Sequence, residues 1–228
     1  MHPVSVRPEI IARVLARRGR VEWFDRLDPA RTALVVIDMQ TAFCAPGAPA
    51  EVPLARAIVP AINTLTAVLR KLGCPVIWVL HANTSRGNRS DWELFFNHVV
   101  GDDVRERTIA ALAPGQQTIW SELDVSADDH TVIKNRYSAL IPGSSQLERL
   151  LRSLGIDTVL IAGTKTNVCC ESTARDAMML DFKTVMLSDC CAALSDDEHR
   201  ATLETILQQF GDVSTVDQVL RKLSAGNT

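Results

Sequence analysis

The chain has 228 residues, of which 46% are hydrophobic, and a formal net charge of −3 from 24 basic and 27 acidic residues. This length suits one α/β domain with a large core, and the interspersed charges exclude a basic stripe for nucleic acid or a polybasic membrane anchor. No apolar run approaches the roughly 20 residues that span a bilayer, and the N-terminal residues lack the apolar core of a signal peptide. We therefore expect a cytoplasmic protein that acts on a small molecule.

The first 30 residues differ in composition from the rest of the chain. They are rich in Arg and Pro, and contain a helical stretch at 10–18 followed by Trp23 and Phe24. We interpret residues 1–30 as an N-terminal arm that packs on the domain of residues 31–228 or on a neighbouring subunit. Its apolar side chains form no strand pattern, which makes a homo-oligomer the expected assembly.

From residue 32 onward, strands alternate with helices. Short apolar, β-branched segments predict strands at 32–38, 75–81, 130–134, 157–162 and 183–189, with a possible edge strand at 211–216. Helical patterns follow at 54–72, 104–112, 145–154, after Cys169 and at 196–210, and residues 82–103 form a long polar connection. This alternation predicts a three-layer, doubly wound, Rossmann-like α/β fold whose mostly parallel sheet is covered by helices on both faces.

In such folds the active site lies beyond the carboxyl ends of the strands. The residues at these positions are Asp38, His81, Lys134, the turn 164–169 and Asp189. No glycine-rich motif for a dinucleotide or a nucleoside triphosphate follows any strand. The sequence therefore predicts an active site without a nucleotide cofactor.

Cys169 lies where the apolar strand 157–162 passes through a polar turn into a helix. In a first helical turn, unpaired N–H groups and the helix dipole stabilise an anion, which lowers the pKa of a thiol. The alternative is an ordinary buried cysteine. The six cysteines lack the C-x-x-C spacing of zinc sites, and we expect all of them to be thiols.

Asp38, Lys134 and Cys169 together form a workable covalent catalyst. A carboxylate can take the proton of a thiol and return it to a leaving amine, while a lysine between them stabilises the thiolate. Taken singly, Asp38 could be a turn cap and Lys134 a solvated strand end. Their common position at the strand ends favours catalysis.

Three motifs of the chain resemble those of the isochorismatase-like superfamily of cysteine hydrolases. They are ALVVIDMQTAF (33–43), IKNRYSAL (133–140) and AGTKTNVCCESTARDA (162–177). The resemblance implies Asp38 as general base and acid, Lys134 as electrostatic support and Cys169 as nucleophile. It also implies a cis peptide bond between Thr164 and Lys165, an oxyanion hole of the Lys165 and Cys169 N–H groups, and assembly into dimers or tetramers.

The cysteine favours C–N hydrolysis, because superfamily members that cleave the vinyl ether of isochorismate lack it. The Asp-x-His pattern of metal-binding nicotinamidases is absent from residues 81–92, so we expect no metal and no other cofactor. The prediction is a metal-independent cysteine amidohydrolase that acts on a small amide or ureido compound through a thioester. A vinyl ether hydrolase and a non-catalytic family member remain alternatives.

The motifs around Lys134 and Cys169 are most similar to the ureidoacrylate amidohydrolase branch. On that reading Arg136 would bind a substrate carboxylate, because a guanidinium binds carboxylates with two hydrogen bonds. The other residues that we expect to contact substrate are Phe43, Asn83, Trp92 and Tyr137, although loop packing explains them equally well. The Lys165 side chain departs from the small residue usual at its position, and we expect it to point to solvent.

Overall fold

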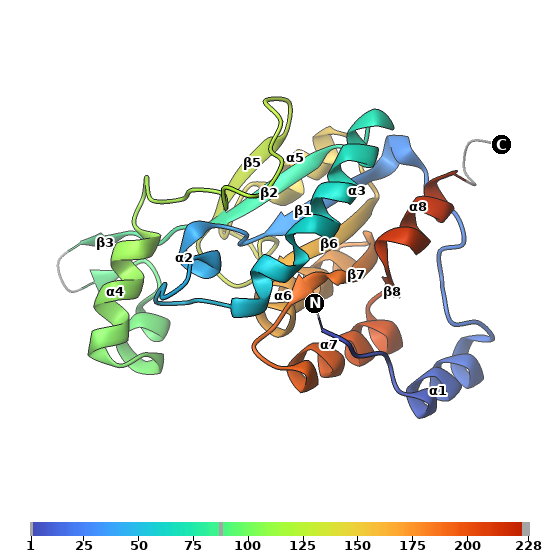
Figure 1. Cartoon of the computed structure of the whole chain (residues 1–228), viewed down its shortest axis with the longest axis horizontal. Coiled ribbons are helices and arrows are strands. Elements are labelled where there is room, and N and C mark those ends of the chain that lie inside the picture. The colour runs from blue at the N-terminus through green and yellow to red at the C-terminus, as the bar shows by residue number, and fades with distance from the viewer. Residues whose placement is uncertain (1, 87–88, 225–228) are drawn as a thin grey trace.

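A six-stranded sheet forms the centre of the structure, a computed structural model that describes residues 2–86 and 89–224 (Figure 1). The strand order is β5-β2-β1-β6-β7-β8, and all neighbouring pairs in it are parallel. The strands are β1 (Thr32–Ile37), β2 (Val76–His81), β5 (His130–Lys134), β6 (Thr158–Thr164), β7 (Lys183–Ala192) and β8 (Asp212–Ser214). The predicted parallel sheet is thus confirmed, and its possible last strand lies at one edge.

Helices cover both faces of this sheet, as the sequence predicts (Figure 1). One face packs against α3 (Val59–Lys71) and α8 (Val216–Ser224). The other packs against α5 (Leu147–Ser153), α6 (Glu171–Met179) and α7 (Asp196–Gln209). The result is the three-layer α/β arrangement expected for a parallel sheet that is buried on both sides.

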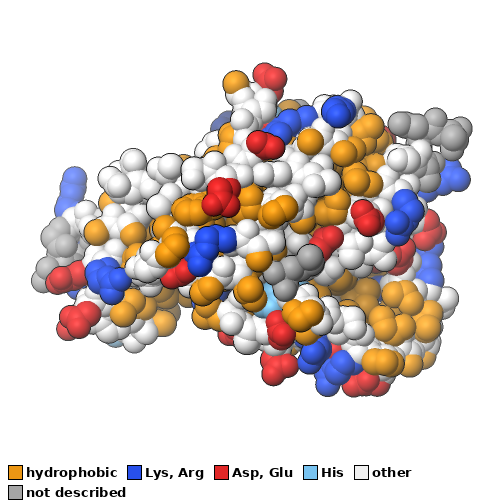
Figure 2. Space-filling model, in the orientation of Figure 1, with side chains coloured by type: hydrophobic (Ala, Val, Ile, Leu, Met, Phe, Trp, Pro, Cys, Tyr) orange, Lys and Arg blue, Asp and Glu red, His pale blue; other side chains and the backbone are white. Residues whose placement is uncertain are grey.

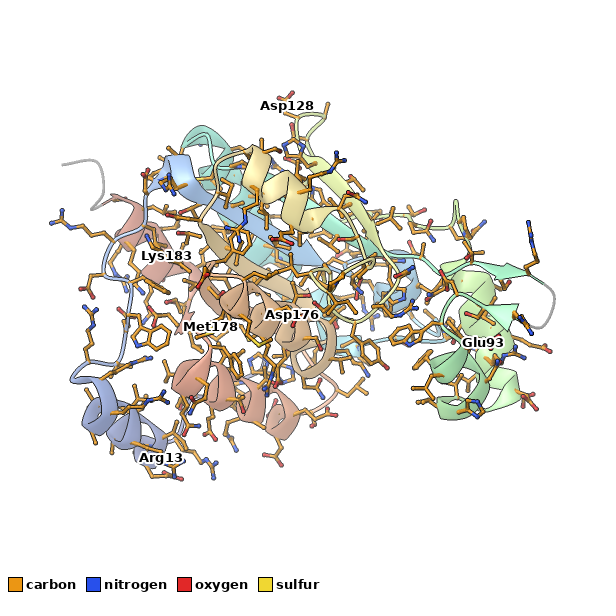
Figure 3. All side chains as sticks on the ribbon, turned by 180° about the vertical axis from the view of Figure 1, so that it is seen from behind. Arg13, Glu93, Asp128, Asp176, Met178 and Lys183 are labelled. Carbon is orange, nitrogen blue, oxygen red and sulfur yellow. The ribbon has the colours of Figure 1, made fainter. Side chains whose placement is uncertain are left out.

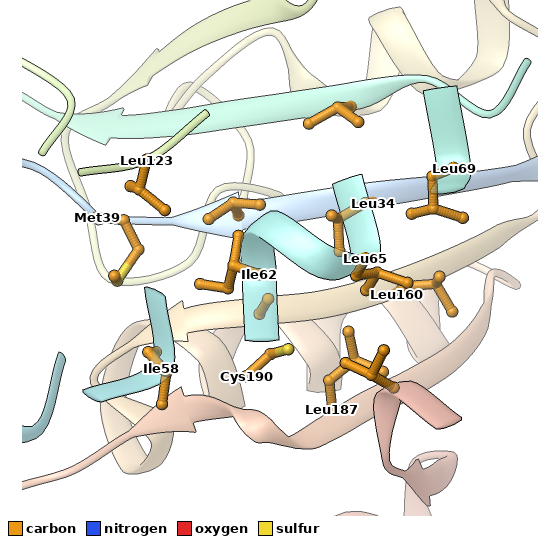
Figure 4. Packing of buried hydrophobic residues seen from close by; sticks show 14 of the residues in the cluster. Leu34, Met39, Ile58, Ile62, Leu65, Leu69, Leu123, Leu160, Leu187 and Cys190 are labelled. Carbon is orange, nitrogen blue, oxygen red and sulfur yellow. The ribbon is translucent and has the colours of Figure 1, made fainter. Parts of the chain in front are cut away.

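Alternation along β1 divides its side chains between the two faces. Leu34 and Val36 belong to the core beneath α3, whereas Ala33, Val35 and Ile37 belong to the core on the opposite face. All six residues of this strand are buried. Figure 4 shows the first core, in which leucines of the strands meet Ile62, Leu65 and Leu69 of α3.

Two helical segments differ from the prediction. The helix expected at 54–72 is split into a 3₁₀ helix, η2 (Pro53–Ile58), and α3. Pro60 explains the division, since proline lacks the N–H that would continue an α-helical hydrogen-bond ladder. Helix α8 was not predicted, although Val216, Val219 and Leu223 have helical spacing and are buried.

The connection predicted to be a long polar segment contains regular structure. It includes β3 (Ser85–Arg86) and β4 (Arg89–Ser90), which pair antiparallel, and a π-helical turn, η3 (Phe95–Val99), ahead of α4 (Asp102–Leu112). We call residues 82–86 and 89–112 the lobe. Figure 3 shows Glu93 of the lobe far from Arg13 of α1, and a small core centred on Phe96 holds the lobe together.

Two further helices precede β1 and one follows it, and the N-terminal arm lies on the domain of its own chain. The helices are α1 (Pro8–Arg18), η1 (Pro29–Arg31) and α2 (Thr41–Cys44). Arg7 Nη2 lies 2.6 Å from Glu204 Oε2 of α7. Further along, the Asp212 carboxylate accepts the Trp23 N–H at 2.8 Å and the Phe24 N–H at 2.9 Å. The expected dimer or tetramer stays a prediction.

The surface offers no single-sign patch on the face seen in Figure 2, where acidic and basic side chains are interspersed with hydrophobic ones. This matches the balanced charge of the sequence. Within residues 2–86 and 89–224, no helix combines the length and apolarity needed to cross a membrane.

Candidate active site

Three chemically active side chains meet at the carboxyl edge of the sheet. Asp38 directly follows β1, Lys134 is the last residue of β5, and Cys169 lies in the π-helical segment η4 (Thr166–Cys170) that follows β6. Asp38 and Lys134 are 0% exposed and Cys169 is 6% exposed, so the site is almost closed to bulk water. The strand-end rule therefore selected three residues that the fold brings together.

Lys134 lies between the other two groups. Its Nζ is 2.9 Å from Asp38 Oδ2 and donates a hydrogen bond of 3.6 Å to Cys169 Sγ. Both side chains of the Asp38 and Lys134 ion pair are fully buried. Two opposite charges that are removed from water at this distance hold each other in the ionised form.

Glycine at position 163 allows the ends of β6 and β1 to approach closely. Gly163 pairs with Ile37, the residue before Asp38, and has a φ of +114°. A Cβ atom at this position would lie 2.0 Å from the Ile37 carbonyl oxygen, which no side chain can accommodate. Asp38 itself has a φ of +55°, in the left-handed region that aspartate tolerates better than most residues.

The segment that joins β6 to α6 has the expected strand-to-helix form. The Thr164–Lys165 peptide bond is cis. Helical structure begins at Thr166 and continues without a break into α6, which places Cys169 in the first helical turn. The neighbouring Cys170 is 0% exposed and belongs to the core beneath α5, α6 and α7.

The pKa of the Cys169 thiol is raised, whereas the sequence predicted that the helix start would lower it. Burial, followed by the charge of Asp38, raises the pKa of Cys169 to about 12, although Lys134 opposes this shift. The helix start therefore does not yield a preformed thiolate, because the sequence could not reveal how deeply the sulfur is buried. Burial also raises the pKa of Asp38, whereas the charges of Asp38 and Cys169 outweigh burial and raise the pKa of Lys134.

A cavity of about 450 Å³ opens above Cys169. Four residues predicted to contact substrate line it: Phe43, Asn83, Trp92 and Tyr137. The sequence reasoning missed several apolar residues of the lobe and one after β7, namely Phe95, Val99, Val100, Leu112 and Leu194. The apolar run FFNHVV inside the polar connection was the available signal for the lobe residues.

Aromatic rings form one wall of this cavity. The Trp92 ring stacks on Phe95 at a centroid distance of 4.9 Å and meets Tyr137 edge-on at 4.7 Å. It also lies parallel to the His81 ring at 6.0 Å. Because these rings fix one another, the wall presents a rigid apolar surface to a bound molecule.

The structure does not support a substrate clamp at Arg136. This residue is not among those that line the cavity, and its guanidinium donates to the carbonyl oxygens of Asn135 and Asp91, each at 2.7 Å. It also lies 5.2 Å from the centre of the Trp92 ring, so it supports the aromatic wall from behind. In contrast, Lys165 is half-buried and lines the cavity, where the sequence had suggested a side chain in solvent.

Metal ligands do not gather in the described part of the chain. There, no group of three or more His, Cys, Asp or Glu side chains is arranged to hold a metal ion. His81, one of the strand-end residues, contacts Lys134 and Asn83. Catalysis without a metal stays a prediction.

Comparisons with known proteins identify the family to which the domain is similar. The isochorismatase domain model matches residues 32–218. A cysteine hydrolase from Pseudomonas syringae pv. phaseolicola 1448A is similar in structure, with a TM-score of 0.76, 31% identity, and coverage of 90% of this chain and 97% of that one.

Two curated plant proteins are also similar in sequence. Nicotinamidase 3 of Arabidopsis thaliana is 29% identical over 84% of this chain and 88% of its own length. A probable inactive nicotinamidase of the same plant is 32% identical over 75% of this chain and 86% of its own length.

Proposed function

The chain belongs to the isochorismatase family of hydrolases, and we propose that it is a metal-independent cysteine amidohydrolase. It would cleave a C–N bond of a small amide or ureido compound through a thioester on Cys169. One observation carries the proposal: the Lys134 ammonium lies 2.9 Å from Asp38 Oδ2 and 3.6 Å from Cys169 Sγ, and both of these partners line the cavity. The similarity to a nicotinamidase and to a cysteine hydrolase supports this chemistry.

The first half of the reaction forms the thioester. Because the raised pKa keeps the Cys169 thiol protonated at rest, its proton passes to Asp38 as the sulfur attacks the substrate carbonyl carbon. The negative charge that develops on the carbonyl oxygen would be stabilised by the Lys165 and Cys169 N–H groups. Asp38 then returns the proton to the leaving nitrogen, the C–N bond breaks, and ammonia or an amine departs.

The second half regenerates the enzyme. A water molecule enters the cavity, gives one proton to Asp38 and attacks the thioester carbon. The C–S bond breaks, the Asp38 proton returns to the sulfur, and the acid or carbamate product leaves. Lys134 stays protonated throughout, because a negative charge on Asp38 or on Cys169 raises its pKa against the effect of burial, and it stabilises whichever of the two carries that charge.

The cavity suits a substrate with a polar reacting end and a planar or apolar body. Asp38 and Cys169 form its floor, while Phe43, Trp92 and Tyr137 lie along its walls. The ureidoacrylate amidohydrolase branch remains a hypothesis about this specificity. Arg136 gives it no support, because its guanidinium is already bonded to backbone carbonyl groups.

Ammonia release from a panel of primary amides and ureido compounds tests the proposal. We expect turnover by the wild-type protein without added metal and in the presence of a chelator, with none by Cys169→Ala. Intact-mass measurement during turnover should reveal the acyl group on Cys169, and Asp38→Asn should fail to form it. Equal ammonia release by wild type and Cys169→Ala would refute the proposal.

The same panel separates the alternatives. Turnover of isochorismate but of no amide would assign C–O hydrolysis, and the absence of any turnover would indicate a non-catalytic member. The second alternative has one specific observation in its favour, the similarity to a probable inactive nicotinamidase.

A further inference from the structure

His81 ends the strand that separates Lys134 from Asp38 in the sheet. Lys134 ends β5 and Asp38 follows β1, but β2 lies between these two strands. His81, the last residue of β2, is the register partner of Lys134. A lysine that reaches from β5 toward Asp38 must therefore pass over His81, which is itself 4% exposed.

The contacts of the lysine ammonium show what His81 does there. An ammonium has three N–H groups and no acceptor. Those of Lys134 donate to His81 Nδ1 at 2.8 Å, to the Arg136 carbonyl oxygen at 3.0 Å and to Cys169 Sγ at 3.6 Å. Two fixed acceptors thus take two of the N–H groups. The third is left to face Asp38 and Cys169, whose Oδ2 and Sγ lie 2.9 Å and 3.6 Å from Nζ.

We propose that His81 is a positioning residue for the catalytic centre: its Nδ1 accepts one N–H of Lys134 and thereby holds the ammonium against both Asp38 Oδ2 and Cys169 Sγ. The role of Cys169 as nucleophile rests on the proposed function, whereas the effect of His81 on the thiol does not need a substrate.

A chain of hydrogen bonds fixes the tautomer that this role requires. His81 Nε2 lies 2.7 Å from Asn83 Oδ1, an acceptor, so Nε2 carries the proton and Nδ1 is free to accept. The Asn83 amide cannot be turned around, because its Nδ2 donates to Asp91 Oδ1 at 2.8 Å and to the Asn135 carbonyl oxygen at 3.2 Å. The lobe residue Asp91 is in this way connected to the catalytic lysine.

The backbone and the charge state of His81 agree with this assignment. Gln40 Oε1 accepts the His81 N–H at 2.7 Å, and its Nε2 donates to the His81 carbonyl oxygen at 3.1 Å, so the residue is held from both sides. Burial, followed by the charge of Lys134, lowers the pKa of His81 well below its usual value. The imidazole is therefore neutral at pH 7, as an acceptor must be.

Two matched substitutions separate positioning from packing. In His81→Asn the amide oxygen can occupy the place of Nδ1, so the acceptor for Lys134 is kept. In His81→Gln the amide is one bond longer and reaches the place of Nε2, so the contact with Asn83 is kept and the acceptor for Lys134 is lost. Both replacements are polar, and thermal melting shows whether both fold.

The measurement is the rate at which iodoacetamide alkylates Cys169, followed by peptide mass spectrometry between pH 6 and 10. Against wild type, we expect His81→Gln to react on the order of tenfold more slowly at pH 8 and to stay slower up to pH 10, since the pKa of the Cys169 thiol lies above this range. His81→Asn should stay within roughly threefold of wild type. When Lys134→Met is already present, adding His81→Gln should not change the alkylation rate further, because His81 acts through the lysine.

Two results would overturn the inference: a wild-type alkylation rate in folded His81→Gln, or equal losses in the Asn and Gln variants. If either variant fails to fold, Asn83→Leu gives a second test, since loss of the Nε2–H partner frees the imidazole to adopt the other tautomer. It should slow alkylation, and an unchanged rate would contradict the role of the tautomer. Failure of the amide panel with the expected alkylation pattern would refute the proposed function alone.

Discussion

Removal of the Lys134 charge should destabilise the protein in a way that depends on pH. Lys134→Met would leave the Asp38 carboxylate fully buried without its cation. Breaking a buried ion pair from one side costs about 3–5 kcal/mol, because an uncompensated charge remains. Asp38 can avoid part of this cost by taking up a proton. The free energy of that protonation, which depends on pH, is therefore the upper limit of the destabilisation.

The limit follows from the pKa of Asp38 in the unfolded chain, about 3.9. Each pH unit above that value adds about 1.36 kcal/mol to the cost of holding the proton in the folded state. The limit is therefore about 1.5 kcal/mol at pH 5 and about 5.6 kcal/mol at pH 8. Since the folded-state pKa of Asp38 is raised, the variant loses stability as the pH rises above the unfolded value.

Urea unfolding at pH 5 and pH 8 measures this effect, with the double variant Asp38→Asn/Lys134→Met as its control. Asparagine tolerates the left-handed φ of +55° at position 38 and carries no charge. Both variants lose the same Lys134 hydrogen bonds, so the difference between them isolates the unpaired carboxylate. We expect about 3–5 kcal/mol between them at pH 8 and at most about 1.5 kcal/mol at pH 5. If the single and the double variant were equally stable at both pH 5 and pH 8, Asp38 would not be a buried charge.

Two further predictions concern the fold around the site. Gly163→Ala should cost at least about 3 kcal/mol, because its Cβ would overlap the Ile37 carbonyl oxygen. Gly155→Ala is the control, since Gly155 also has a positive φ, of +71°, but open space around its Cβ, and this change should lower the melting temperature much less. In wild type, stability should fall between pH 6.5 and pH 4, because burial lowers the folded-state pKa of His199 to about 4 while the unfolded chain still binds the proton near 6.5. His199→Gln should weaken this fall by up to about 3 kcal/mol in urea unfolding, and an unchanged pH profile would assign the acid sensitivity to other groups.

The alternation of apolar strands and amphipathic helices was enough to predict the parallel sheet and its edge strand. That pattern reports burial directly, because strands covered on both faces are apolar throughout, as Val76–His81 is apart from its last residue. Helix α8 was missed although its pattern was present. The lobe was misjudged for a physical reason: its small core joins Phe96 to Ala42 and Leu112, residues that are separated in sequence and give no local periodicity.

The sequence by itself determined which residues would meet, because parallel strands bring their carboxyl ends to one edge whatever their order. Asp38, Lys134 and Cys169 were among the residues chosen on that ground, and their combined chemistry singled them out. Only the tertiary structure decided the state of these groups and their neighbours. Burial makes Cys169 a protonated thiol at rest, the bonds of Arg136 to backbone carbonyls remove it from the cavity, and the strand order sets His81 between Asp38 and Lys134. Desolvation and strand neighbourhood depend on packing across the whole domain, which no local stretch of residues encodes.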